Sequence, residues 1–397
     1  MDPALIPLHT LPIGALENLL RLLLKPLVVV LVFGLAIWWA DDEPSRLVGL
    51  VWTFPFCLQM WKRFPEVISF DNTYNTNRFK LPLFQVTGQT CLGSVYNAAF
   101  GLIDNERIEG FQFLSESIRQ LVAQHSIREP DVIITDYDKQ MKATLNEQFP
   151  EVQQQLCIHH INSNVMLKAK QKWSKHQDHS DTSEPDDEEP GATAQLSKVD
   201  KGCILAPADQ TFPHTYRGVL EMWKLVVFSE TEEAHEKAWA DLCKEFDDQR
   251  PILRYLYGTY MPMRAQWARC FIRHYRNFGT RVTSGTEASN NNIKSYLLNG
   301  LSHLYRLVDV MQDMIQDQEL SFTQACAADE VLSGREYMTT RSEYLGELRS
   351  MLSSKALGLI TRQHRLAKSA LPTGRNPRPD PLGNCTDDCS VSVEGIH

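Results

Sequence analysis

The sequence has few of the features that define membrane and secreted proteins. Its longest uncharged apolar run, at residues 27–40, is shorter than the roughly 20 apolar residues that a membrane-spanning helix needs. Its nine cysteines follow no regular framework, which indicates reduced thiols rather than a disulfide-stabilised domain. We therefore expect no membrane partner. Residues 27–40 are predicted to form a buried strand or helix, or an irregular chain start, with a membrane anchor as the alternative.

The sequence also lacks an excess of basic residues. It has 40 Lys and Arg against 49 Asp and Glu, for a formal net charge of −9. This balance argues against nucleic-acid binding through bulk charge but allows local basic patches. Seven acidic residues fall within residues 177–195, which contain no Lys or Arg, so the rest of the chain carries only −2. With few apolar groups to bury, this stretch is expected to be a solvated, disordered insertion.

Hydrophobic periodicity predicts a mixed α/β layer followed by helices. Strands are expected at residues 67–70, 81–86, 95–103 and 132–134, and helices at 110–124 and 139–148. Residues 216–281 and 284–368 have helical spacing, and the tail from residue 369 is rich in Pro and Gly. The length of 397 residues and the 43% hydrophobic composition suffice for two or three compact units.

Two aspartates come directly after predicted strands, Asp71 after Phe70 and Asp136 after Thr135. Carboxylates at the ends of neighbouring strands would face each other, and a hard divalent cation with oxygen ligands would relieve their repulsion. The alternative is that each aspartate caps the next turn, a common role for Asp at the end of a strand. Asp138 fits a helix N-cap better than a metal ligand.

The third acidic candidate is Glu287. Ser284 and Glu287 have the spacing of a capping box, so helix capping alone would explain both residues. On a helix, Asn290, Asn291 and Lys294 would share a face with Glu287. Such a polar stripe could meet a phosphate backbone as easily as water.

A segment rich in arginine and aromatic residues precedes Glu287. It interleaves Arg264, Arg269, Arg273, Arg276 and Arg281 with Trp267, Phe271, Tyr275 and Phe278. Arg269, Arg273 and Arg276 would share a helical face and could bind a DNA backbone, while the rings could stack on unpaired bases. An amphipathic helix with aromatic residues in the core and solvated arginines explains the pattern equally well.

Several short motifs occur along residues 45–350. They are Asp71-Asn-Thr-Tyr-Asn-Thr-Asn77, Pro82, Gly88, Phe100-Gly-Leu-Ile103, Thr135-Asp136, Phe149-Pro150, Leu156-Cys-Ile-His-His160, Asn164, Phe228-Ser-Glu-Thr-Glu232 and Asn277-Phe-Gly-Thr-Arg-Val-Thr-Ser284. In this order, with Glu287, they resemble the transposase domain of Mutator-like elements. Plant transcription regulators of the far-red-impaired-response type share this domain and are regarded as domesticated transposases.

The resemblance implies an RNase H-like α/β core with a mixed sheet, a large α-helical insertion and a helical C-terminal region. Asp71, Asp136 and Glu287 would form its DDE triad, which would hold two Mg²⁺ or Mn²⁺ ions for phosphodiester cleavage and strand transfer at transposon ends. The resemblance also implies DNA as the partner, both transposon ends and target, a homo-oligomer on that DNA, and localisation in the nucleus.

Together with the composition, the resemblance predicts how the chain is divided into domains and segments. They are an apolar segment of unclear role at 1–44, the first part of the core at 45–170, an acidic insertion at 171–200, a helical insertion domain at 201–282, the helix that completes the core with further helices at 283–368, and a disordered tail at 369–397.

Cys157 and His160 match the Cys-x-x-His element of the family, and we interpret them as packing beneath the site or supporting its ligands. A zinc site that adds His176 and His179 is a weaker alternative. Residues 385–389 resemble the start of a zinc-binding SWIM motif, and no set of Cys and His ligands precedes Asp71, which favours a truncated or decayed copy. The alternative function is therefore a domesticated, non-catalytic DNA-binding or transcription-regulatory protein that retains the fold.

Overall fold

The computed structural model describes residues 33–40, 46–173, 212–279, 292–297, 300–337 and 340–370. These residues form two compact units. The first unit lies within Met1–Ile133, Asp138–Val152 and Thr283–His397, and the second within Ile134–Tyr137 and Gln153–Val282. The predicted acidic insertion, the tail with its cysteine pair, and His176 and His179 lie outside the described residues.

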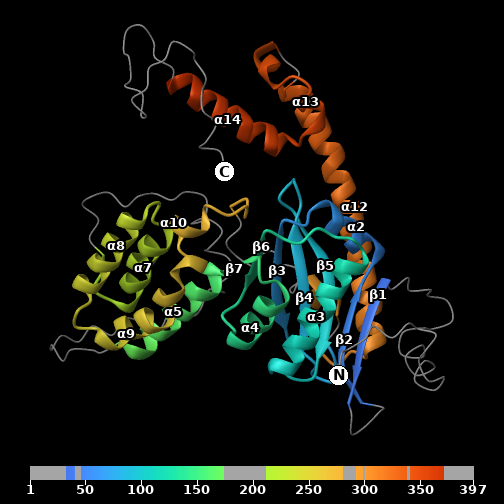
Figure 1. Cartoon of the computed structure of the whole chain (residues 1–397), viewed down its shortest axis with the longest axis horizontal. Coiled ribbons are helices and arrows are strands. Elements are labelled where there is room, and N and C mark those ends of the chain that lie inside the picture. Colours follow the sequence, from blue (N-terminus) through green and yellow to red (C-terminus); the bar gives the residue numbers. More distant parts are fainter. Residues whose placement is uncertain are drawn as a thin grey trace. The chain divides into compact units, whose positions relative to one another are not determined.

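A sheet of seven strands in the order β1-β2-β5-β4-β3-β6-β7 organises the α/β part of the chain (Figure 1). Its strands are β1 (Phe33–Trp39), β2 (Leu47–Thr53), β3 (Val67–Thr73), β4 (Leu83–Gln89), β5 (Val95–Ile103), β6 (Val132–Thr135) and β7 (Gln153–Leu156). The neighbouring pairs among β1–β5 are antiparallel. Helix α2 (Pro55–Arg63) links β2 to β3, α3 (Ile108–Gln124) leads from β5 to β6, and α4 (Lys139–Gln148) leads from β6 to β7.

The predicted mixed α/β architecture is confirmed, and β5 and α4 have the predicted bounds. α4 begins where predicted because Asp138 caps it: Asp138 Oδ1 accepts the backbone N–H groups of Gln140 and Met141, at 2.8 Å each. These bonds satisfy donors that the first turn of a helix otherwise leaves unpaired. The interpretation of Asp138 as an N-cap is therefore confirmed.

One prediction about β3 is wrong. Asp71 does not end the strand, because Asn72 and Thr73 continue its antiparallel pairing with Phe84 and Leu83 of β4. The polar side chains after Phe70 suggest a loop, but backbone pairing with a neighbouring strand outweighs the local preference of these residues. Asp71 is therefore held by strand geometry on both sides.

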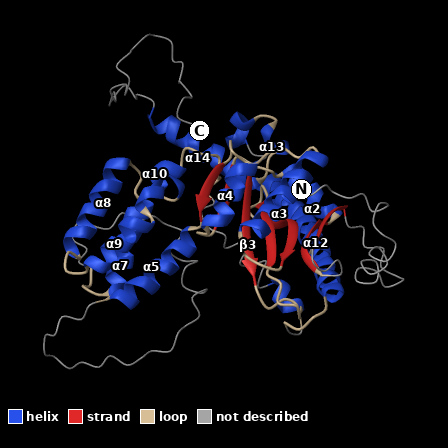
Figure 2. Ribbon diagram, turned by 60° about the horizontal axis from the view of Figure 1, so that its bottom comes forward, coloured by secondary structure: helices blue, strands red, loops and turns tan. Residues whose placement is uncertain are grey.

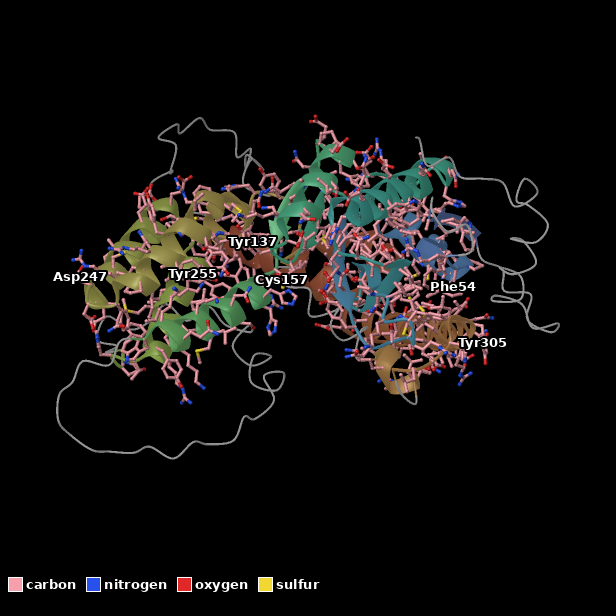
Figure 3. The ribbon with its side chains drawn as sticks, turned by 90° about the horizontal axis from the view of Figure 1, so that it is seen from below. Phe54, Tyr137, Cys157, Asp247, Tyr255 and Tyr305 are labelled. Atoms are coloured by element: carbon pink, nitrogen blue, oxygen red, sulfur yellow. The ribbon has the colours of Figure 1, made fainter. Side chains whose placement is uncertain are left out.

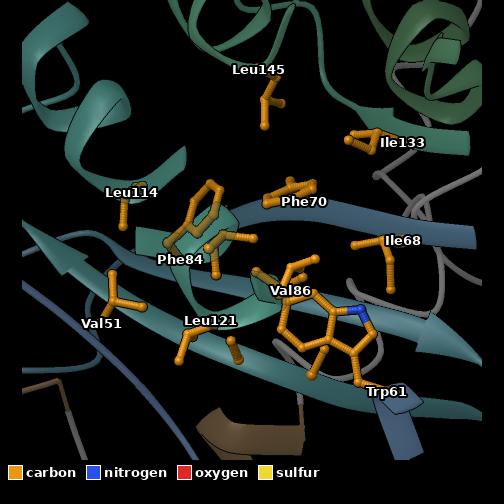
Figure 4. Close-up of a cluster of buried hydrophobic side chains, with 14 of the residues drawn as sticks. Val51, Trp61, Ile68, Phe70, Phe84, Val86, Leu114, Leu121, Ile133 and Leu145 are labelled. Atoms are coloured by element: carbon orange, nitrogen blue, oxygen red, sulfur yellow. The ribbon is translucent and has the colours of Figure 1, made fainter. Parts of the chain in front are cut away.

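One face of the first unit's strands packs against α3 and α4 (Figure 4). Phe70 of β3 and Phe84 of β4 belong to a hydrophobic cluster with Leu114 of α3 and Leu145 of α4. Helix α3 lies so close to β5 that a Cβ atom on Gly101 would be only 2.4 Å from Leu114 Cδ2. Because that contact leaves no room for a side chain, Gly101 sets the spacing between helix and sheet.

The opposite face of these strands packs against α12 (Leu304–Tyr337). Trp52 and Phe100 join Leu307, Met311 and other residues from the first half of this helix in a second hydrophobic cluster. Because successive strand residues alternate between the two faces, Asp71 of β3 lies on the α12 side, opposite to Phe70.

The outer end of α12 forms a small satellite core with the elements that follow it. These are η3 (Thr340–Leu345), α13 (Leu348–Met351) and α14 (Ser354–Ala370). Tyr337, Leu345 and Leu357 are its buried members. In addition, the Asp329 carboxylate accepts the backbone N–H of Ser354 at 2.9 Å, so α14 begins at a fixed point on α12.

The apolar run at residues 27–40 contains β1, which pairs with β2. Of the predicted alternatives, a strand is thus confirmed for the described part of the run, although residues 36–39 are half-buried rather than buried. Across the portion of the chain that the structure describes, no helix has both the length and the apolar character needed to cross a membrane.

The second unit is built mainly from helices (Figure 2). They are α5 (Ile158–Lys172), α7 (Tyr216–Phe228), α8 (Glu232–Glu245), α9 (Arg250–Thr259), η2 (Met261–Gln266) and α10 (Arg269–Ile272). Trp223 is fully buried at their centre, with ring centroids 4.9 Å from Trp267 and 5.9 Å from Tyr260. Buried aromatic pairs of this kind contribute both area and specific geometry to a core.

Candidate functional site

Asp71 is a buried carboxylate in the interior of β3. Only 8% of its surface is exposed, and one of its oxygens accepts the backbone N–H of Asn72 at 3.0 Å. Its partner in the register is Gln85 of β4. Residues directly opposite in an antiparallel pair have Cβ atoms about 4.5–5.5 Å apart, so the two side chains are neighbours on the α12 face.

A chain of buried amides extends from Gln85 to α12. Gln85 Oε1 accepts a hydrogen bond from Asn97 Nδ2 at 2.8 Å, and Asn97 Oδ1 accepts one from Gln318 Nε2 at 2.7 Å. Gln318 Oε1 accepts the backbone N–H of Asn97 at 3.4 Å. These bonds fix the amide of Gln85 beside Asp71, and sequence reasoning missed all three residues. The available signal was a pair of amides, Gln85 and Asn97, within otherwise apolar strands.

Asp136 comes immediately after β6, and β6 lies next to β3 in the sheet order. Its side chain is 45% exposed, and Oδ1 accepts the backbone N–H of Tyr137. His160 Nδ1 lies 3.8 Å from the same oxygen. Burial is the main cause that raises the pKa of nearby Tyr260, and the Asp136 carboxylate acts in the same direction. Tyr260 therefore stays a neutral phenol near Asp136.

Cys157 and His160 have different environments although they share one motif. Cys157 is buried at the N-cap of α5, and its backbone N–H donates to Thr135 O at 2.8 Å (Figure 3). This bond ties the start of α5 to the end of β6 and so places His160, in the first helical turn, beside Asp136. A buried thiol of this kind packs as a small apolar group.

No group of three or more His, Cys, Asp or Glu among the described residues could hold a metal ion. Of the predicted triad, Glu287 lies outside these residues. The structure therefore describes two carboxylates of the candidate site, and the third remains a prediction from sequence.

The arginine-rich segment is not the long amphipathic helix that its spacing suggests. Helix α10 covers only Arg269–Ile272, and turns follow it. Asn277 stabilises these turns: its Nδ2 donates to Ile272 O at 3.2 Å and its Oδ1 accepts the Gly279 N–H at 3.0 Å. Phe278, with φ of 50°, and Gly279, with φ of 78°, adopt left-handed conformations that a helix does not permit.

Two of the three arginines predicted to bind DNA contact a carboxylate. Arg269 Nη2 lies 2.6 Å from Glu230 Oε1, and Arg273 Nη1 lies 3.5 Å from Glu230 Oε2. Arg273 also donates to the backbone carbonyl of Glu230 at 3.0 Å. Glu230 thus offsets part of the charge of Arg269 and Arg273. Arg276 is exposed on the turn that follows α10.

The aromatic residues of this segment divide between core and surface. Trp267 is fully buried, as the amphipathic interpretation predicts, whereas Tyr275 and Phe278 are 45% and 64% exposed. The segment therefore combines a core anchor with a surface that carries both rings and cations.

Comparison with known proteins bears directly on the segment that carries Asp71 and Asp136. Residues 67–164 match the model of the MULE transposase domain. Over these residues the chain is similar to the MULE transposase family. The matched residues run from the first residue of β3 into α5, so the domain includes Asp71, Asp136, Cys157 and His160. The predicted resemblance is thereby confirmed.

The chain is also similar to curated proteins, over different lengths. The PKS-NRPS hybrid synthetase cheA of Chaetomium globosum is 32% identical over 376 residues, which is 90% of this chain and 7% of that protein. FAR1-RELATED SEQUENCE 5 of Arabidopsis thaliana is 27% identical over 135 residues, 34% of this chain and 17% of its own length. FAR-RED IMPAIRED RESPONSE 1 of the same plant is 28% identical over 120 residues, covering 30% of this chain and 14% of its own length.

The remaining predicted DNA contacts fall outside the MULE transposase match. Lys294 is exposed on a short helix at residues 292–296, which Ile293 anchors in the α12-side core. Asn291 lies outside the described residues, as Glu287 does. The exposure of Lys294 is compatible with contact to a phosphate backbone.

Proposed function

We propose that this chain is a DNA transposase of the Mutator-like type, which cleaves phosphodiester bonds and joins strands at transposon ends. The observation that carries the proposal is the MULE transposase match at residues 67–164, which contains Asp71 of β3 and Asp136, directly after β6. Because the chain spans only 7%, 17% and 14% of the three relatives described above, its activity is argued from its own residues.

We further propose that β3–β7 form an RNase H-like core. In support, the sheet order β5-β4-β3-β6-β7 places three sequential antiparallel strands beside two strands that are reached through α3 and α4. In this order, the first strand of the core, β3, lies beside the fourth, β6. The arrangement would bring the Asp71 strand and the end of the Asp136 strand into one site.

The residues present fit a divalent cation. Asp71 and Asp136 offer carboxylate oxygens, the ligand type that Mg²⁺ and Mn²⁺ prefer. Asp71 is 8% exposed, and a buried carboxylate is stabilised when a cation balances its charge. Asp71, Asp136 and Glu287 are proposed to hold two such ions, which when bound would activate the attacking oxygen and stabilise the leaving oxygen of the phosphodiester.

The chain's own residues would position this chemistry. The strand pairing of β3 and the amide of Gln85 would keep Asp71 fixed, while His160 would orient the more exposed Asp136 through their 3.8 Å contact. Arg276 and Lys294 remain proposed contacts to the DNA backbone. Arg269 and Arg273 are proposed contacts as well, although Glu230 offsets part of their charge.

The testing experiment compares Asp136→Asn with Asp138→Asn. The first substitution removes a proposed metal ligand, so Mn²⁺-dependent nicking of DNA that carries candidate element ends should fall at least about a hundredfold, while DNA binding is retained. The second removes the same charge two residues away, at the cap of α4, where Asn caps about as well as Asp. Its activity should therefore stay near that of the wild type, and equal activity of Asp136→Asn and wild type would refute the assignment.

A second candidate is a domesticated DNA-binding or transcription-regulatory protein that keeps the fold without activity. The observation that favours it is the similarity to the FAR1-related proteins, whose type the sequence resemblance identifies as domesticated regulators. This candidate predicts DNA binding by the wild type without metal-dependent cleavage. For either function we propose action in the nucleus, and for the transposase a homo-oligomer on DNA.

A further inference from the structure

The loop that follows β3 carries a group of planar side chains on the surface of the first unit. We define the rim cluster as Arg78, Phe79, His303 and Tyr305. The Arg78 guanidinium lies 5.6 Å from the centroid of the Phe79 ring, and Arg78 Nη1 lies 3.1 Å from His303 Nε2. The rings of His303 and Tyr305 stack at 5.6 Å with an interplanar angle of 22°. The four flat groups thus contact one another in a row, in the order Phe79, Arg78, His303 and Tyr305.

The rim cluster stands on a rigid loop. Asn77 is buried, and its side chain bridges the loop: Nδ2 donates to Leu81 O at 2.7 Å, and Oδ1 accepts the Leu81 N–H at 3.1 Å. The backbone N–H of Arg78 donates to Ser302 O at 2.9 Å, which joins the loop to the chain around His303. The cluster is therefore held in place before any ligand arrives.

Two residues of this loop also have strained backbone conformations. Asn75 has φ of 61° and Lys80 has φ of 57°, in the left-handed region that non-glycine residues seldom adopt. Such conformations cost free energy, and they concentrate at functional sites. The loop thus combines strain with the buried bonds of Asn77, which is the pattern of a pre-organised binding element.

The rings of the rim cluster remain accessible although the loop itself is fixed. Phe79 is 53% exposed and Tyr305 is 36% exposed. Among the described residues, Arg78 forms no ion pair, and Lys80 is exposed beside Phe79. Glu106 lies at the same end of β3, but its carboxylate accepts hydrogen bonds from Asn72 and Tyr74 rather than pairing with Arg78. Exposed rings next to uncompensated cations suit a ligand that is both flat and anionic.

We propose that the rim cluster binds an unpaired nucleotide of DNA, with the base stacked on Phe79 and the phosphate near Arg78 and Lys80. Stacking on an aromatic ring requires an exposed base face, which a fully paired duplex hides within its stack. Thr73 and Leu83 form the last pair of the hairpin, two residues beyond Asp71 and Gln85, or about 7 Å along the strand. This inference rests on the proposed function, because the loop with Arg78 and Phe79 continues from β3, the strand that holds the proposed metal ligand Asp71.

The test measures affinity for two DNA probes by fluorescence anisotropy, in EDTA so that no cleavage occurs. One probe is a short blunt duplex, and the other is the same duplex with a single-stranded 3′ flank that carries 2-aminopurine. Phe79→Ala should weaken binding to the flanked probe about tenfold and binding to the blunt probe less than twofold. Phe79→Trp should restore both the affinity and the quenching of 2-aminopurine that stacking causes.

Tyr257→Ala is the matched control, since Tyr257 is a comparably exposed ring, 64% exposed, in the second unit. It should change neither affinity. Equal binding of the flanked probe by Phe79→Ala and wild type would overturn the rim-cluster proposal alone, as would equal losses on both probes. A wild-type protein that binds neither probe would overturn both this proposal and the proposed function.

Discussion

At the scale of single residues, the two aspartates within the MULE transposase match differ in how firmly they are held. Asp71 is buried within a paired strand, whereas the side chain of Asp136 is 45% exposed after the end of a strand. A buried carboxylate keeps its position but is destabilised by desolvation, and an exposed one can adjust to a ligand. We infer that Asp71 provides the fixed oxygen of the proposed metal site and Asp136 the adaptable one.

The amide chain behind Asp71 gives a stability prediction. Gln318→Ala should lower the free energy of unfolding by about 1–3 kcal/mol, because it leaves the buried Asn97 amide without its 2.7 Å partner. Urea unfolding measures this change. Gln316→Ala, at an exposed position one half-turn away on α12, is the control and should stay within about 0.5 kcal/mol of wild type. Equal values for the two variants would show that the amide chain does not stabilise the fold.

The sequence alone reveals Asp71 and Asp136, because each follows an apolar run that predicts a strand. It does not reveal the amides that support Asp71. Gln85 and Asn97 are 12 positions apart, and Asn97 and Gln318 are 221 positions apart. Only the strand register and the packing of α12 bring them together, and neither is encoded in local periodicity.

At the scale of elements, the helices and strands that could be predicted are those whose ends are defined by local sequence signals. β5 is an apolar run interrupted only by Asn97, and α4 begins at a capping aspartate, so both have local signals that define their ends. α10 has strong helical periodicity but ends after Ile272. Its end depends on bonds that the Asn277 side chain makes, which a pattern of apolar residues does not register.

Helix α8 contains a buried histidine that should make the second unit sensitive to acid. His235 is 1% exposed, its Nδ1 lies 2.9 Å from Val226 O, and its ring packs 5.7 Å from that of Trp267. Burial is the largest influence on its pKa and lowers it, although the Val226 carbonyl opposes the shift. The folded protein therefore holds His235 neutral at a pH where an unfolded chain would take up a proton.

The sign of the pH dependence follows from this difference. The unfolded state binds more protons below a pH of about 6.5, so the free energy of unfolding of the second unit should fall as the pH drops from about 7.5 to about 5.5. Urea unfolding followed by tryptophan fluorescence measures it. His235→Gln should reduce this pH dependence, whereas His274→Gln, at an exposed position, should leave it unchanged. A wild-type stability that stays constant or rises over this range would contradict the prediction.

At the scale of the whole molecule, the MULE transposase match includes segments of both compact units. Asp71 belongs to the first unit and Asp136 to the second. In the sheet order, β6, which directly precedes Asp136, is next to β3, which holds Asp71.

The central claim, that Asp71 and Asp136 hold the same metal site, is tested most directly by a Mn²⁺ titration of the full chain. Electron paramagnetic resonance of free Mn²⁺ reports binding without any need for DNA or activity. The wild type should bind Mn²⁺, Asp71→Asn and Asp136→Asn should each weaken that binding at least about tenfold, and Asp138→Asn should not change it. Loss of binding in only one of the first two variants, or in none of them, would contradict the claim.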